Sequence, residues 1–160
     1  MTTASQMPPV RRSALRESWI DFLERQEFNV GLTLNLNMGA VPLVLAHQRV
    51  RDLFFRVDRR LLGTRFTTRP AERTHGVLFV EHPQSNLHLH GLLRVRPDRV
   101  EEFASLFPGE RGGPWSDVCA SGTHFIRDVQ GRAAAAYVTK AQSLDLDDGT
   151  MIWLDQFYAA

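Results

Sequence analysis

The 160-residue chain contains a single cysteine, Cys119. One cysteine excludes an internal disulfide and a cysteine-based zinc cluster, and it fits a reducing compartment. We therefore expect a cytoplasmic protein in which Cys119 is an inert core residue. Long hydrophobic runs are also missing, since the apolar stretches fall well short of the roughly 18 residues that a membrane span needs. We expect no membrane partner.

The N-terminal residues lack the apolar core of a secretory signal. Residues 1–13 are expected to form a flexible tail. The remaining residues, 14–160, have the length and the apolar content of one soluble domain with a proper core.

Lysine is nearly absent, because Lys140 stands alone beside eighteen arginines. The net charge of +1 conceals a local excess: eight arginines lie between positions 49 and 73, with three acidic residues. Guanidinium groups pair with phosphates in a bidentate way, so this segment suits a nucleic-acid backbone. A solvated helix face is the simpler alternative for such a run. The arginines predicted to contact nucleic acid are Arg49, Arg56, Arg59 and Arg60.

Periodicity separates the chain into helices and strands. Helical spacing of apolar residues covers 14–26 and 43–61, and a short helix is expected over 98–107 and another from 131. Strands are expected over 30–37, 76–81, 87–93, 121–129 and 151–157, and 109–115 has the composition of a loop. The sum is an α+β domain: a central antiparallel sheet with helices packed mainly on one face.

The segment from Glu81 to Gly91 carries the strongest functional signal. His88 and His90 alternate with leucines, so in a strand both imidazoles point to the same side. The intervening residues are typical of a turn, and a hairpin closing there puts Glu81 opposite His88 or one step away. Two imidazoles and a carboxylate form a divalent-metal site with open positions. The adjacent His82 is the alternative third ligand, and two solvated histidines on an edge strand are the simpler interpretation.

A second cluster follows in the late helix, where Tyr137-Val-Thr-Lys140 places a phenol and an ammonium three residues apart. A phenol is a poor nucleophile when protonated, but a nearby cation favours the phenolate and a metal polarises the phosphate under attack. Together the two clusters supply the parts for covalent phosphoryl transfer, with Tyr137 and Lys140 as the catalytic residues. The alternative is a tyrosine packed on the sheet and a solvated lysine.

These motifs resemble those of the HUH endonucleases, the rolling-circle replication initiators of plasmids, small phages and single-stranded DNA viruses. The resemblance spans about residues 28–141 and uses three segments in order: Leu32–Asn37, His88-Leu-His90 and Tyr137–Lys140. The metal motif precedes the tyrosine, as in initiators, whereas the tyrosine comes first in conjugative relaxases. Tyr158 is too far from Tyr137 to share its helix, which matches the single-tyrosine class.

The resemblance implies a variant of the ferredoxin-like fold, with metal ligands on an exposed sheet face and the tyrosine helix across from them. It implies nicking and rejoining of single-stranded or origin hairpin DNA, dependent on Mg²⁺ or Mn²⁺, through a 5′-phosphotyrosine. A host helicase is the expected partner for unwinding. Asn35 and Asn37 of the first motif are predicted to contact nucleic acid.

Three alternatives stay open at the level of sequence. A transposase of the same superfamily shares the His-hydrophobe-His strand. A non-catalytic domain on the same fold would only bind nucleic acid, and a structural metal-binding module would have no DNA role. His47, His75 and His124 are expected to be surface or core residues rather than ligands. The three tryptophans are expected to pack in the core, with stacking on bases as the alternative.

Overall fold

The computed structural model describes residues 9–140 and 149–159. Five antiparallel strands form one sheet in the order β4-β1-β3-β2-β5. The strands are β1 (Val30–Asn35), β2 (His75–Glu81), β3 (His88–Arg94), β4 (Thr123–Asp128) and β5 (Met151–Trp153). The predicted α+β class is thereby confirmed.

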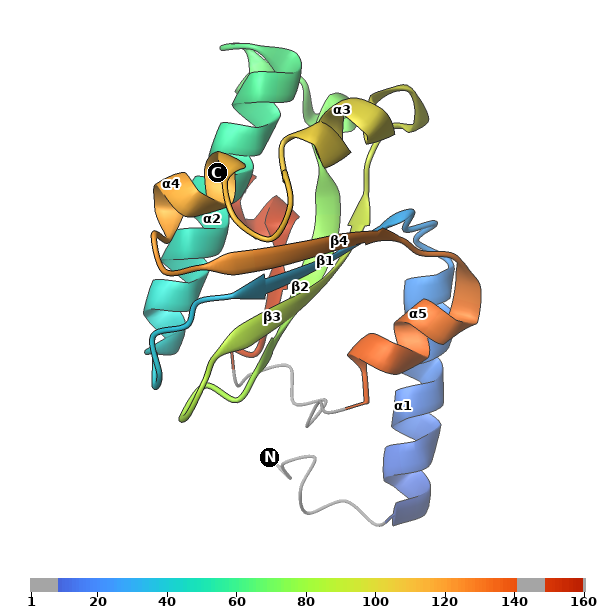
Figure 1. Cartoon of the computed structure of the whole chain (residues 1–160). Coiled ribbons are helices and arrows are strands. Elements are labelled where there is room, and N and C mark those ends of the chain that lie inside the picture. Colours follow the sequence, from blue (N-terminus) through green and yellow to red (C-terminus); the bar gives the residue numbers. More distant parts are fainter. Residues whose placement is uncertain (1–8, 141–148, 160) are drawn as a thin grey trace.

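Helices cover both faces of the sheet. They are α1 (Pro9–Glu24), α2 (Leu43–Leu62), α3 (Val100–Ser105), α4 (Gly113–Val118) and α5 (Gly131–Val138). Short 3-10 segments lie at 66–68, 70–72, 97–99 and 154–158. Figure 1 shows α2 on one side of the sheet and α1 with α5 on the other. The helices thus lie on both faces rather than mainly on one, and α5, which carries Tyr137, is on the face opposite to α2.

The two sheet faces have separate hydrophobic cores. On the face covered by α2, here called the α2 face, Leu34, Leu78 and Leu89 pack with α2, α3 and α4. On the opposite face, here called the α5 face, Val77 and Phe79 pack with α1 and α5. Because β2 is covered on both sides, it is apolar at nearly every position rather than alternating.

The ends of several helices differ from the expectations. Helix α1 begins at Pro9, inside the segment assigned to a flexible tail, while residues 1–8 lie outside the described residues. The segment 109–115 was expected to be a loop, but α4 begins at Gly113. There Pro114 occupies the first turn of a helix, where its missing N–H is harmless. The last predicted strand is short, since β5 ends at Trp153 and a 3-10 segment follows.

Gly113 has a structural reason to be glycine. Its φ is +58°, and a β-carbon there would lie 1.9 Å from the Leu106 carbonyl oxygen. Any other residue would have to displace the backbone that joins α3 to α4.

Candidate metal and tyrosine site

The β2–β3 hairpin sets the position of the three predicted metal ligands. In its register Glu81 lies directly opposite His88, and Phe79 lies opposite His90. The turn begins at His82, whose carbonyl oxygen accepts hydrogen bonds from the Ser85 and Asn86 amides. The side chains of Glu81, His88 and His90 project from the α5 face, next to Phe79, which is buried in the core of that face. The predicted hairpin is confirmed, and of the two alignments left open the direct pairing of Glu81 with His88 is the one observed.

One carboxylate oxygen joins the two histidines. Glu81 Oε2 lies 3.0 Å from His88 Nε2 and 3.2 Å from His90 Nε2. The side chains are 14% exposed for Glu81, 21% for His88 and 11% for His90, so they are largely shielded yet open to solvent. Two imidazole nitrogens and a carboxylate converging in this way could hold a metal ion.

The outer nitrogens of both imidazoles also have polar neighbours. His88 Nδ1 lies 3.0 Å from the Asn86 carbonyl oxygen. His90 Nδ1 lies 3.3 Å from Thr33 Oγ1, on the strand that pairs with β3. Partners of this kind orient a ligand ring and direct its other nitrogen toward the metal.

Burial lowers the pKa of His90 below its ordinary value, although the nearby Glu81 carboxylate opposes this effect. The neutral imidazole is the form that coordinates a metal. The donor set therefore suits a divalent cation on chemical grounds.

His82 lies on the solvent side of this cluster. One ligand atom from each of Glu81, His82 and His88 lies within 4.8 Å of the others, and the His82 and His88 ring centroids are 5.1 Å apart. Glu81 is common to this group and to the one that contains His90. His82 is therefore an additional candidate ligand beside Glu81 rather than a replacement for it.

Tyr137 lies in the last turn of α5, directly over the histidines. Its ring centroid is 5.6 Å from that of His90, at an interplanar angle of 87°. The side chain is 49% exposed. The contact brings the predicted nucleophile and the predicted metal ligands to one place on the α5 face, although they come from distant parts of the chain.

Lys140 was expected on the same helix as Tyr137, but it lies beyond that helix because α5 ends at Val138. Thr139 turns its hydroxyl onto the Ala135 carbonyl oxygen, a local bond that competes with continued helix. The Lys140 amide then donates to the Tyr137 carbonyl oxygen over 3.2 Å, in a tighter i to i+3 turn. Lys140 itself is exposed.

A different cation contacts the tyrosine ring. The guanidinium carbon of Arg127 lies 5.0 Å from the Tyr137 ring centroid. Arg127 projects from β4 on the α5 face and was not among the predicted site residues. The alternation of residues 121–129 could have indicated it, since Thr123, Phe125 and Arg127 share one side of that strand.

Asn35 and Asn37 lie at the edge of the site nearest His88. Asn35 is paired with His88 across β1 and β3, and its side-chain amide donates to Thr123 Oγ1 over 3.1 Å. Asn37, in the left-handed region with φ of +55°, donates to the Ser121 carbonyl oxygen over 3.0 Å. Their proximity to the site agrees with the predicted role, and contact with nucleic acid stays a prediction.

The predicted arginines are not brought to this site. Helix α2 packs its apolar stripe on the α2 face, so its charged side points away from the sheet on the far side of the molecule. Arg49 donates to the Val118 carbonyl oxygen, and Arg60 pairs with Asp117 over 3.1 Å. Arg56 and Arg59 are exposed. Contact of these arginines with nucleic acid stays a prediction, at a distance from the candidate site.

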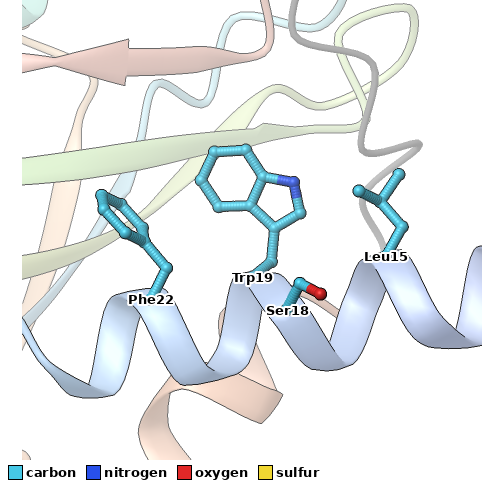
Figure 2. Close-up of a pocket in the computed structure, with 4 residues that line it drawn as sticks. All are labelled: Leu15, Ser18, Trp19 and Phe22. Carbon is cyan, nitrogen blue, oxygen red and sulfur yellow. The ribbon is translucent and has the colours of Figure 1, made fainter.

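The remaining predictions for histidines, tryptophans and cysteine agree with the structure. His124 is buried on the α2 face, and Trp115 and Cys119 lie in the same core. Trp19 and Trp153 pack against the core of the α5 face. An apolar hollow of about 330 Å³ lies on α1 (Figure 2), lined by Leu15, Ser18, Trp19 and Phe22, none of them a site residue.

Comparisons with protein-family models, with curated proteins and with solved structures returned no match. Across residues 9–140 and 149–159, no helix combines the length and apolar character needed to cross a bilayer.

Proposed function

We propose that the chain is a metal-dependent endonuclease that nicks and rejoins single-stranded DNA through Tyr137. The observation that carries the proposal is the contact between Tyr137 and His90, whose Nε2 approaches the same Glu81 oxygen as His88. A structural metal site would not require a tyrosine at its open side. The half-exposed phenol beside the donor cluster favours group transfer at a bound phosphodiester.

Glu81, His88 and His90 would hold the cation, Mg²⁺ or Mn²⁺, with His82 as an outer donor. When bound, a divalent cation polarises the scissile phosphate and neutralises charge on its oxygens. The chain's own residues supply the remaining parts: Thr33 and the Asn86 carbonyl orient the imidazoles, and α5 presents the tyrosine.

The reaction is a balanced transesterification. The Tyr137 oxygen attacks the phosphorus, the bond from phosphorus to the 3′ oxygen breaks, and the phenol proton is passed to that 3′ oxygen, which leaves as a hydroxyl. The DNA 5′ end is then held as a phosphotyrosine. In rejoining, a 3′ hydroxyl attacks that phosphotyrosine and Tyr137 recovers its proton. Arg127 places positive charge beside the ring of Tyr137, which favours the phenolate. Lys140, three residues after Tyr137, would supply a second cation to the phosphate.

The direct experiment is incubation with a pool of single-stranded oligonucleotides and Mn²⁺, followed by denaturing electrophoresis to detect a covalent protein–DNA adduct. We expect the adduct with the unaltered protein and none with Tyr137→Phe. The matched control is Tyr158→Phe, which removes the chain's other tyrosine and should retain the adduct. Tyr158 donates to the buried Asp58 over 3.1 Å, so folding of this control must be verified by thermal denaturation.

The variant His88→Ala tests the metal half of the site. It should abolish adduct formation while largely sparing oligonucleotide binding. Equal loss of both would mean that the histidines are structural. Salt-sensitive binding without an adduct under any divalent metal would contradict catalysis and support a non-catalytic binding domain instead.

A further inference from the structure

Phe125 is an exposed aromatic residue on a sheet face that is otherwise polar at that end. Its side chain is 60% exposed, and it lies at the middle of the edge strand β4. Phe22, another exposed phenylalanine, packs edge-on against Trp19 and Trp153. Within the described residues Phe125 contacts no other ring. Most of its side chain is therefore open to contact from outside.

The sheet register aligns Phe125 with the candidate site. Phe125 pairs with Thr33 on β1, and Thr33 pairs with His90 on β3. The backbones of Phe125 and His90 are therefore two strand spacings apart, a distance of about 10 Å. All three side chains are on the α5 face. Arg127, two residues further along the same side of β4, contacts the Tyr137 ring.

The neighbours of Phe125 favour a nucleobase over a protein partner. On the α5 face it is flanked by Thr33, Thr123 and Asn35, which carry hydroxyl and amide groups, and by the cation Arg127. A protein interface would need a contiguous apolar patch around the ring. A single exposed ring beside a cation is instead the combination that binds single strands, since bases stack on the ring and phosphates pair with the guanidinium.

We propose that the DNA strand enters the site along β4 on the α5 face, a path here called the β4 track. Phe125 stacks on one base, and Arg127 pairs with the phosphate between that base and Tyr137. This rests on the function proposed above and names two positioning residues for it. The track explains how a strand without a duplex could be held in register with the tyrosine although the α2 arginines lie on the other side of the sheet.

The test is the affinity of a fluorescently labelled oligo-dT, measured by anisotropy in a Tyr137→Phe background so that no adduct forms. Phe125→Ala should weaken binding by about fivefold or more, and Phe125→Trp should restore it, because stacking needs only an aromatic face. Arg127→Gln should make the slope of log affinity against log salt concentration shallower, by about the amount that one phosphate contact contributes. Phe22→Ala, which removes an exposed phenylalanine on α1, should bind as the parent does.

The possible failures are distinguishable. If Phe125→Ala binds like the parent while the Tyr137-dependent adduct still forms, the track is wrong and the proposed function stands. If Phe125→Trp fails to restore binding, or if Phe125→Ala lowers the melting temperature as well, Phe125 is structural and the track is again overturned. If the parent binds no single strand and the unaltered protein gives no adduct, both proposals fail together.

Discussion

His124 is buried among apolar groups, with 2% of its surface exposed and its ring centroid 5.3 Å from that of Phe107. Burial lowers the pKa of His124 below the ordinary 6.5, and the carbonyls of Phe107 and Pro108 only partly oppose this shift. The folded state thus prefers the neutral ring, and the unfolded chain binds the proton more readily.

This residue predicts a dependence of stability on pH. Above about 6.5 both states are neutral at His124 and its contribution is fully present; as the pH falls below 6.5 the unfolded state takes up a proton and the free energy of unfolding decreases. The slope from one group is at most about 1.4 kcal/mol per pH unit. Urea denaturation between pH 7.5 and 5 would measure it.

The control is His124→Leu, which has similar volume and no titrating group. The pKa of His90 is also lowered, whereas burial raises the pKa of Asp58, so both groups add their own pH dependence to the stability. The contribution of His124 is therefore the difference between the pH profiles of the parent and of His124→Leu. Parallel profiles for parent and variant would show that His124 does not contribute.

At the scale of elements, α2 and β4 make opposite predictions for DNA binding. Arg56 and Arg59 are exposed on α2, which covers the face opposite to the site. The double variant Arg56→Gln/Arg59→Gln should therefore form the covalent adduct with a short oligonucleotide as fast as the parent. Quantifying the adduct over time checks this. A large loss of adduct would mean that the strand passes over α2, and Arg127→Gln provides the comparison on the α5 face.

The hairpin was the element most completely predictable from sequence. Turn residues between two apolar runs predict the hairpin and bring Glu81 to within one step of His88, and the direct pairing is known from the structure. The end of α5 was not predictable in this way, because a single threonine is a weak signal for a helix end, and the bond from the Thr139 hydroxyl to the Ala135 carbonyl oxygen is known only from the structure.

Local periodicity also does not predict which face of the sheet a helix covers. The stripe on α2 shows that one side of the helix is buried, but it carries no information on which side of the sheet receives it. The arginines were therefore predicted to contact nucleic acid without knowledge of the face on which they lie. Arg127 and Phe125 were missed for the converse reason: β4 was recognised as a strand, but its neighbours in the sheet were unknown.

At the scale of the whole molecule, the position of Tyr137 depends on the N-terminal helix. Helix α5 packs on α1, and Arg16 of α1 donates to the Ala136 carbonyl oxygen over 3.1 Å. Arg132 of α5 pairs with acidic residues of α1, among them Glu24 over 3.4 Å. The tyrosine is thus held over the histidines by a second layer of the fold rather than by the sheet alone.

The variant Leu23→Ala tests how much α1 contributes to the stability of the fold that holds Tyr137. Leu23 is 1% exposed in the core of the α5 face, so we expect its truncation to lower the free energy of unfolding by about 2–5 kcal/mol. Chemical denaturation measures the change, and Ser18→Ala on the exposed side of α1 is the matched control, expected within about 0.5 kcal/mol of the parent. An unchanged Leu23→Ala protein would show that α1 contributes little to the fold.

The two halves of the site differ in how far apart their residues lie along the chain. Glu81, His88 and His90 belong to one hairpin, whereas Tyr137 reaches them only after β4 and α5 have been added. Closing a short loop costs less conformational entropy than closing a long one, and local contacts form faster. During folding, Glu81, His88 and His90 are therefore expected to come together before Tyr137 reaches its position above them.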